Sequence, residues 1–136
     1  MEKRYFTVEE ANDLLPLLEQ ELRRLKQLKE EYQQLHQELR LFQQLHSHLQ
    51  QSRYYQDTVF MLECKLEFKA IEAQMLIEAL AKRGVQIKDI DVGLVDFPAI
   101  LQGEEVLLCW KLGEARVAHY HGIHEGFAGR KRIDEA

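Results

Sequence analysis

The chain has 136 residues, 46% of them hydrophobic and 30% charged, and its 23 acidic and 18 basic residues give a formal net charge of −5. This length and apolar fraction suit one folded domain, and the negative charge disfavours general binding to nucleic acids. No apolar stretch approaches the roughly 20 residues of a membrane span, and the two cysteines lack a CxxC spacing, so we expect a cytoplasmic protein with free thiols and no membrane association.

A capping box predicts the start of the first helix. The Thr7 hydroxyl is spaced to accept the backbone N–H of Glu10, while the Glu10 carboxylate reaches back to the N–H of Thr7. Pro16 follows closely, so it either kinks this helix or marks the beginning of its regular part. Apolar residues then recur at alternating steps of three and four, which is typical of a coiled-coil seam. The seam positions are Leu18, Leu25, Tyr32 and Leu39, and Leu28, Leu35, Phe42 and Leu49.

A shift in this pattern predicts a turn between two helices. Glycine and proline are absent between residues 17 and 83, so one very long helix is the alternative to a hairpin. Continuing the first seam to positions 53, 60, 67 and 74 gives Arg53, Phe60, Glu67 and Gln74, of which only Phe60 is apolar. A new stripe fits Val59, Leu66, Ala73 and Leu80. We therefore predict a turn near residues 47–57 and a second helix over residues 54–83, ended by Gly84.

The length and the apolar faces of these helices predict self-association. A first helix of about 40 residues is roughly 60 Å long, which exceeds the size of a small compact domain. Two antiparallel helices bury one stripe each, so the remaining leucines need cover from a sheet or from another subunit. These are Leu14, Leu15, Leu17, Leu22 and Leu41. We expect a homodimer formed through the helices, and a separate protein partner is the alternative.

After Gly84 the apolar period changes from 3.6 to 2, which predicts strands. We expect an extended segment over residues 85–90 and strands over residues 93–97, 105–112 and 116–121. Pro98 would end the strand of residues 93–97. Residues 113–115 would join the last two as a hairpin. Trp110 and Cys109 belong to opposite apolar faces of the third segment, so this strand should be central, with helices on one side.

Together these elements predict a single α+β domain over residues 1–136. A long antiparallel, coiled-coil-like helical hairpin, residues 7–83, would be followed by a small antiparallel β-sheet of three to four strands, residues 85–121. Residues 122–136 would form an irregular tail.

Histidines near the end of the sheet are candidates for chemistry. His119 and His121 are two apart on a predicted strand, so they project from one face and are able to chelate one ion, such as zinc. Glu114, His124 or Glu125 would then complete the ligand set. The plainer interpretation is a pair of sheet histidines that hydrogen-bond to their neighbours. A third is acid/base chemistry by His121 beside a carboxylate of Glu114 or Asp96.

The acid on the short strand needs an explanation of its own. Asp96 lies between apolar residues, and a buried carboxylate needs a partner, for which Arg130 and His121 are candidates. Alternatively, Asp96 caps the turn at Pro98. The sequence contains no Walker loop, dinucleotide-binding fingerprint, zinc-finger spacing or HExxH helix.

Several segments resemble a known family. The chain is similar to the bacterial domain-of-unknown-function family 2203 over nearly its whole length. The segments that carry the likeness are Phe6–Asn12 with Leu14–Pro16, Gly93–Ala99, Val106–Trp110, Gly113–Glu114, Tyr120–His121 and Gly126–Arg130. The resemblance implies one domain with a helical N-terminal half and a short sheet, and it implies no activity. Its matching polar residues are Asp96, Trp110, Glu114, His121 and Arg130, which favours a polar cluster of Asp96, Glu114 and His121.

These observations lead to two functional hypotheses. The first is an oligomeric scaffold or protein-interaction module built on the helical hairpin. The second is a small metal-dependent or acid/base enzyme that uses Asp96, Glu114 and His121, with Arg130 holding an anionic substrate. In the metal-dependent version, a divalent ion such as zinc would be held by His121, His119, Glu114 and Asp96.

Overall fold

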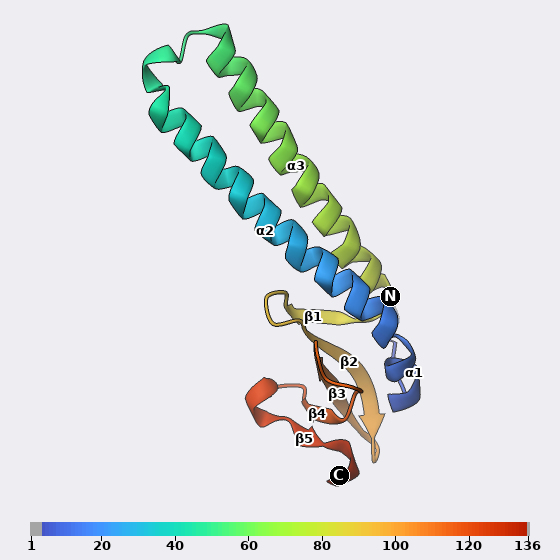
Figure 1. Cartoon of the computed structure of the whole chain (residues 1–136). Helices are drawn as coiled ribbons and strands as arrows, with labels where there is room; N and C mark the ends of the chain where they lie inside the picture. Colours follow the sequence, from blue (N-terminus) through green and yellow to red (C-terminus); the bar gives the residue numbers. More distant parts are fainter. Residues whose placement is uncertain (1–3, 136) are drawn as a thin grey trace. The chain divides into compact units, whose positions relative to one another are not determined.

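The computed structural model describes residues 4–135 and confirms the α+β class (Figure 1). The helices are α1 (Val8–Asp13), α2 (Leu15–Leu45) and α3 (Arg53–Lys82), with the short 3₁₀ turns η1 (Ser47–Leu49), η2 (Phe127–Gly129) and η3 (Ile133–Glu135). The strands are β1 (Gln86–Asp89), β2 (Leu94–Leu101), β3 (Glu104–Lys111), β4 (His119–Gly122) and β5 (Lys131–Arg132). Within the described residues, no helix is both long and apolar enough to cross a membrane.

The chain divides into two compact units. We call residues 25–76, which contain most of α2 and α3, the arm. The remaining described residues, 4–24 and 77–135, form the sheet unit, which contains α1, the first turns of α2, the last turns of α3 and every strand.

The capping box forms as predicted at the start of α1. Glu10 N donates to Thr7 Oγ1 and Thr7 N donates to Glu10 Oε1, each over 3.0 Å. α1 ends at Asp13, and α2 begins at Leu15. Pro16 is thus the second residue of α2, where its missing N–H removes no helical hydrogen bond. Of the two alternatives for Pro16, the beginning of the regular stretch is the one observed.

The arm is the predicted helical hairpin. Its turn spans residues 46–52, and Ser52 Oγ accepts the N–H of Tyr55 over 3.1 Å, which caps α3. Between the helices, Lys69 Nζ lies 2.6 Å from Glu31 Oε2. One buried cluster of this unit consists of Leu39, Leu62 and Leu66, and Leu35, Phe42 and Val59 pack against it. Tyr32, expected on the seam, is 38% exposed.

The sheet has five antiparallel strands in the order β1-β2-β3-β4-β5, so β3 is central as predicted. One face packs on helices. The ring of Phe97 meets that of Phe6 edge-on, with centroids 5.4 Å apart, and Trp110 lies beside Leu15 and Pro16. This face also buries Val95, Ala99, Val106 and Leu108.

The prediction that Pro98 ends its strand is wrong. β2 continues to Leu101, and Pro98 pairs with Leu107 of β3. The Pro98 carbonyl accepts the N–H of Phe6 over 2.7 Å, so the backbone polar groups of Pro98 face away from β3. The pairing of β1 with β2 extends only to Asp96, so no strand on that side needs a backbone N–H from Pro98. Proline is tolerated at such a position.

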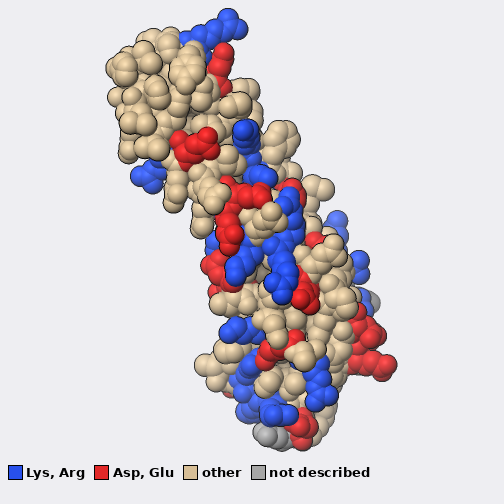
Figure 2. All heavy atoms as spheres, in the orientation of Figure 1, with Lys and Arg blue, Asp and Glu red and all other residues tan. Residues whose placement is uncertain are grey.

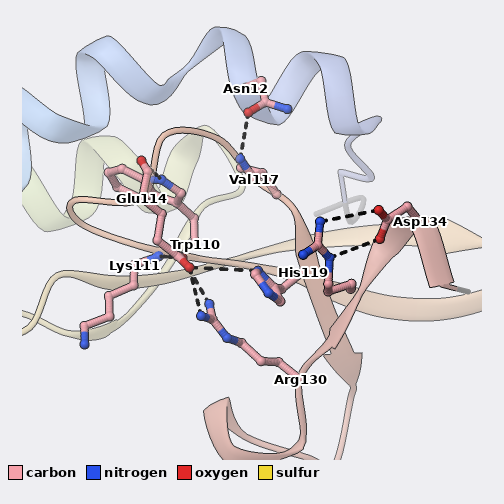
Figure 3. Close-up of polar contacts among 9 residues, drawn as sticks. Asn12, Trp110, Lys111, Glu114, Val117, His119, Arg130 and Asp134 are labelled. Atoms are coloured by element: carbon pink, nitrogen blue, oxygen red, sulfur yellow. Dashed lines mark hydrogen bonds and ion pairs between the residues drawn. The ribbon is translucent and has the colours of Figure 1, made fainter.

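The predicted count of three to four strands is also too low, because part of the expected irregular tail forms a fifth strand. Lys131 and Arg132 add β5 beside β4, and 3₁₀ turns form on either side of them. β4 starts later than predicted, at His119, because the N–H of Val117 donates instead to Asn12 Oδ1 of α1 over 2.7 Å (Figure 3).

Candidate functional site

The sheet face that points away from Phe97 and Trp110 carries the polar residues. Side chains alternate along a strand, and the register pairs Asp96 with Cys109 and Cys109 with His119. His121 lies two residues further along β4, opposite Leu107. Asp96, Cys109, His119 and His121 therefore project from one face, and they come from the three middle strands.

The side chains of His121 and Asp96 contact each other on this face. His121 Nε2 lies 3.1 Å from Asp96 Oδ2, and His121 Nδ1 lies 2.8 Å from the carbonyl oxygen of Gly122. A carbonyl oxygen only accepts hydrogen bonds, so Nδ1 carries a proton and donates to Gly122. The other nitrogen, Nε2, is then aimed at the carboxylate, and this hydrogen-bond pattern fixes the ring orientation.

Cys109 completes a buried group of three. One donor atom from each of Asp96, Cys109 and His121 lies within 4.8 Å of the other two. Burial raises the pKa of the Cys109 thiol to about 11, and the nearby charge of Asp96 acts in the same direction. Among the described residues, Asp96 Oδ1 has no hydrogen-bond partner. The three side chains are at most 4% exposed, so a substrate would reach them only after local opening.

A second polar group lies at the β3–β4 connection (Figure 3). Arg130 donates to both carboxylate oxygens of Glu114, over 3.0 and 2.8 Å, and Lys111 N donates to Glu114 Oε1 over 2.8 Å. Burial alone would raise the pKa of Glu114, but the hydrogen bonds from Arg130 and Lys111 outweigh it and lower that pKa. Trp110 Nε1 donates to the Glu114 carbonyl over 3.0 Å, which fixes the loop that carries the carboxylate.

The C-terminal segment reaches this polar face through Arg130. The Arg130 guanidinium stacks on Phe127 at 4.3 Å from the ring centroid, and it also interacts with Cys109. His119 Nδ1 lies 3.9 Å from Glu114 Oε2. Arg130 thus lies between the two polar groups.

The structure groups the predicted site residues into two sets. It brings Asp96 together with His121, and it brings Glu114 together with Arg130 and His119. Glu125 acts locally, since its Oε1 accepts the N–H of Gly122 over 3.0 Å, and His124 is exposed.

Cys109 was missed as a site residue because a lone cysteine on an apolar strand is usually a core residue. The Gln102-Gly103 pair is a sequence signal from which the position of Cys109 beside Asp96 could have been predicted. Both residues have positive φ, 51° and 79°, as in a two-residue hairpin turn, and such a turn sets the register that pairs Asp96 with Cys109.

The fold and the site define an α+β protein in which a helical hairpin is joined to a five-stranded antiparallel sheet with a buried Asp-Cys-His group. The family described as "Uncharacterized conserved protein (DUF2203)" matches residues 4–133, so the chain belongs to this family, as its resemblance indicated. Comparisons with curated proteins and with solved structures found no significant match.

Proposed function

We propose that this protein is a homo-oligomeric interaction module that self-associates through the outer face of α3. The observation that carries the proposal is an apolar seam on the arm, spaced by alternating steps of three and four residues. Its members are Met61, Cys64, Phe68, Ile71 and Met75, and Tyr54 continues it one heptad earlier. We call these six residues the outer seam.

Five of the six outer-seam residues are exposed in the single chain, and Cys64 is half-buried. Phe68 is 72% exposed and Met75 65%, values that are unusual for large apolar side chains on a regular helix. At about 100° per residue, the seam lies on the side of α3 opposite Leu62 and Leu66, which pack against α2. α3 thus has two apolar stripes, and the hairpin covers one of them.

The size of the outer seam suits a helix-helix interface. Phe and Tyr side chains each bury about 150–250 Å² when fully covered, and together with its Met and Ile residues the seam exposes apolar surface on the order of 600 Å² per copy. A standard protein interface buries about 800 Å² per partner. Contiguous apolar seams of this kind supply the centre of such interfaces, with polar residues around the rim.

A second copy is the occupant that the seam fits best. In an antiparallel two-fold pairing of α3, Phe68 packs against Ile71 of the second copy and Cys64 packs against its Met75. The same register brings Lys65 near Glu72 of the second copy, so opposite charges flank the apolar centre. On the face shown in Figure 2, basic and acidic side chains are interspersed, and this face offers no broad single-sign surface to a nucleic acid.

The test is the molar mass in solution. Sedimentation equilibrium of the full chain at about 50 µM should give a dimer, and Phe68→Glu should weaken it at least about 100-fold, because a carboxylate would be buried in the interface. The matched control is Leu41→Glu, which changes a residue 56% exposed on α2 and should leave the dimer intact. A monomeric wild-type chain, or equal effects of the two variants, would overturn the proposal.

Disulfide trapping tests the register. Met75→Cys should cross-link to Cys64 of the second copy under mild oxidation. Within one chain the two positions are 11 residues apart on a helix, roughly 16 Å, too far for a disulfide. A cross-link through Cys64 alone in the unmodified chain would instead indicate a parallel pairing.

The alternative, an enzyme, has less support because Asp96 and His121 are buried, whereas catalytic groups must contact substrate. Cys64 and Cys109 are free thiols, which fits the reducing conditions of the cytoplasm. We therefore place the protein in the cytoplasm as part of this proposal.

A further inference from the structure

The contact between His121 and Asp96 requires a positive species between the two side chains. Nδ1 of His121 donates its proton to the Gly122 carbonyl, so in the neutral ring Nε2 presents a lone pair. That lone pair faces the Asp96 carboxylate at 3.1 Å, and both groups are buried. Two facing lone pairs at this distance repel each other, so either a proton or a metal ion lies between them.

The surroundings of the pair resemble a ligand set more than a simple hydrogen bond. Cys109 adds a sulfur donor within 4.8 Å of the other two donor atoms. Among the described residues, Asp96 Oδ1 finds no partner although it is buried, which would leave a second carboxylate oxygen uncompensated. A proton on Nε2 would satisfy Oδ2 but not Oδ1, and Cys109 would then interact only with Asp96 and Arg130.

The distances fit a tetrahedral ion. Nitrogen and oxygen ligands about 2.0–2.1 Å from zinc lie roughly 3.3 Å from each other, and a sulfur ligand at about 2.3 Å lies roughly 3.6 Å from either. The observed Nε2–Oδ2 distance of 3.1 Å is close to the first value. All three donor atoms lie within 4.8 Å of one another, so the sulfur would need to move closer by about 1.2 Å at most.

We propose that Asp96, Cys109 and His121 bind one divalent transition-metal ion, with zinc the best match to their oxygen, sulfur and nitrogen donors. The hydrogen bond from His121 Nδ1–H to the Gly122 carbonyl would hold the imidazole in the orientation that aims Nε2 at the ion. Three protein ligands leave the fourth position of a tetrahedral ion to water.

The proposed ion would link β2, β3 and β4 through one atom. Binding releases the thiol proton of Cys109 and any proton held between His121 and Asp96, and both leave to solvent. Because the ligands come from three strands, the ion binds the folded sheet and not the unfolded chain, so it raises stability. This site is independent of the outer seam, since its ligands belong to the sheet unit.

Cobalt(II) is the probe. The full chain is unfolded and refolded in the presence of Co²⁺, because a buried site admits ions slowly. We expect one equivalent to bind, with a near-ultraviolet thiolate-to-cobalt band and visible bands of tetrahedral intensity, and Zn²⁺ should displace it. Zn²⁺ should also raise the Tm of the protein above that of the chelator-treated sample.

Variants separate this site from other thiols and histidines. Cys109→Ser should abolish the thiolate band, and Asp96→Asn and His121→Gln should each lower metal affinity at least tenfold. The control Cys64→Ser should keep both band and stoichiometry. Because a variant could fail to fold, each is checked by circular dichroism, and the spectrum and Tm shift of the unmodified chain stand without the variants. Absence of the band and of the Tm shift, or a band that persists in Cys109→Ser, would overturn the proposal and leave a proton between His121 and Asp96.

Discussion

Arg130 and Glu114 form a bidentate ion pair that holds the C-terminal segment against the connection between β3 and β4. The two hydrogen bonds measure 3.0 and 2.8 Å, and both side chains are less than a quarter exposed. The N–H of Lys111 also donates to Glu114 Oε1 over 2.8 Å, so the carboxylate is held by the backbone as well as by Arg130. Planar guanidinium–carboxylate pairs of this kind are among the stronger polar contacts in proteins.

Glu114→Gln should therefore loosen the C-terminal segment. The amide keeps one acceptor oxygen but loses the charge and one of the two bonds, which we expect to cost about 1–3 kcal/mol of unfolding free energy. Hydrogen exchange should report faster exchange in residues 123–132 and little change in α2. The matched control is Asp134→Asn, which breaks the exposed pair of Asp134 with Arg132 and should cost less than about 0.5 kcal/mol. Equal effects of the two variants would contradict the prediction.

The contribution of Glu114 should depend on pH. The hydrogen bonds from Arg130 and Lys111 lower the folded-state pKa of Glu114 below its ordinary value near 4.5, against the effect of burial, and His119 adds in the same direction. Because the pKa of Glu114 is lower in the folded chain than in the unfolded chain, its contribution to the free energy of unfolding is fully present above the unfolded-state pKa. That contribution is lost as the pH falls through the folded-state pKa. The difference in unfolding free energy between the unmodified chain and Glu114→Gln should be constant from pH 7 to about 5 and shrink below about 4.5. A difference that stays constant down to pH 3 would rule this out.

The helices were predictable because their signals are local and repeated. The seam of α2 extends over many turns, so the loss of its phase near Arg53 revealed a turn that no glycine or proline marks. Ser52 gives a further local signal, since its hydroxyl caps α3. The sheet depended more on context. Pro98 ends a strand in isolation, but here it lies where β1 has already ended and Phe6 supplies the donor.

The sequence identified most residues of the candidate site, but it did not determine which of them contact one another. His121 was one of the candidate partners of Asp96, but the choice among these candidates depends on the register between β3 and β4, which a long connection sets. The turn at Gln102-Gly103 alone would have paired Asp96 with Cys109, because a two-residue turn fixes every pair along both strands. Glu114 was expected in one cluster with Asp96 and His121, but in the folded chain its carboxylate forms hydrogen bonds with Arg130 instead.

Gly93→Ala should destabilise the sheet far more than Gly103→Ala. Both glycines have positive φ, +73° and +79°, so each alanine pays a similar backbone strain of about 1 kcal/mol. A Cβ at Gly93 would also lie 2.5 Å from Leu112 Cβ, whereas a Cβ at Gly103 meets no atom of the described residues within 4 Å. We expect the Gly93 variant to cost at least about 2 kcal/mol more in denaturant unfolding. Similar costs would show that Leu112 moves aside freely.

Asn12 should be required to hold the β3–β4 connection against α1. Its Oδ1 accepts the N–H of Val117 over 2.7 Å, and its Nδ2 donates to the Val8 carbonyl over 3.0 Å, so the amide is oriented at both ends (Figure 3). Val117 is 2% exposed, and Asn12→Ala would leave its N–H without an acceptor, which should cost about 1–3 kcal/mol. Hydrogen exchange of the Val117 amide is the direct measurement, and it should accelerate in Asn12→Ala. Asn12→Asp keeps the acceptor and should retain most of the protection, which separates the loss of this bond from a general disturbance of α1. If the Val117 amide were equally protected in Asn12→Ala, another acceptor would have to hold the connection.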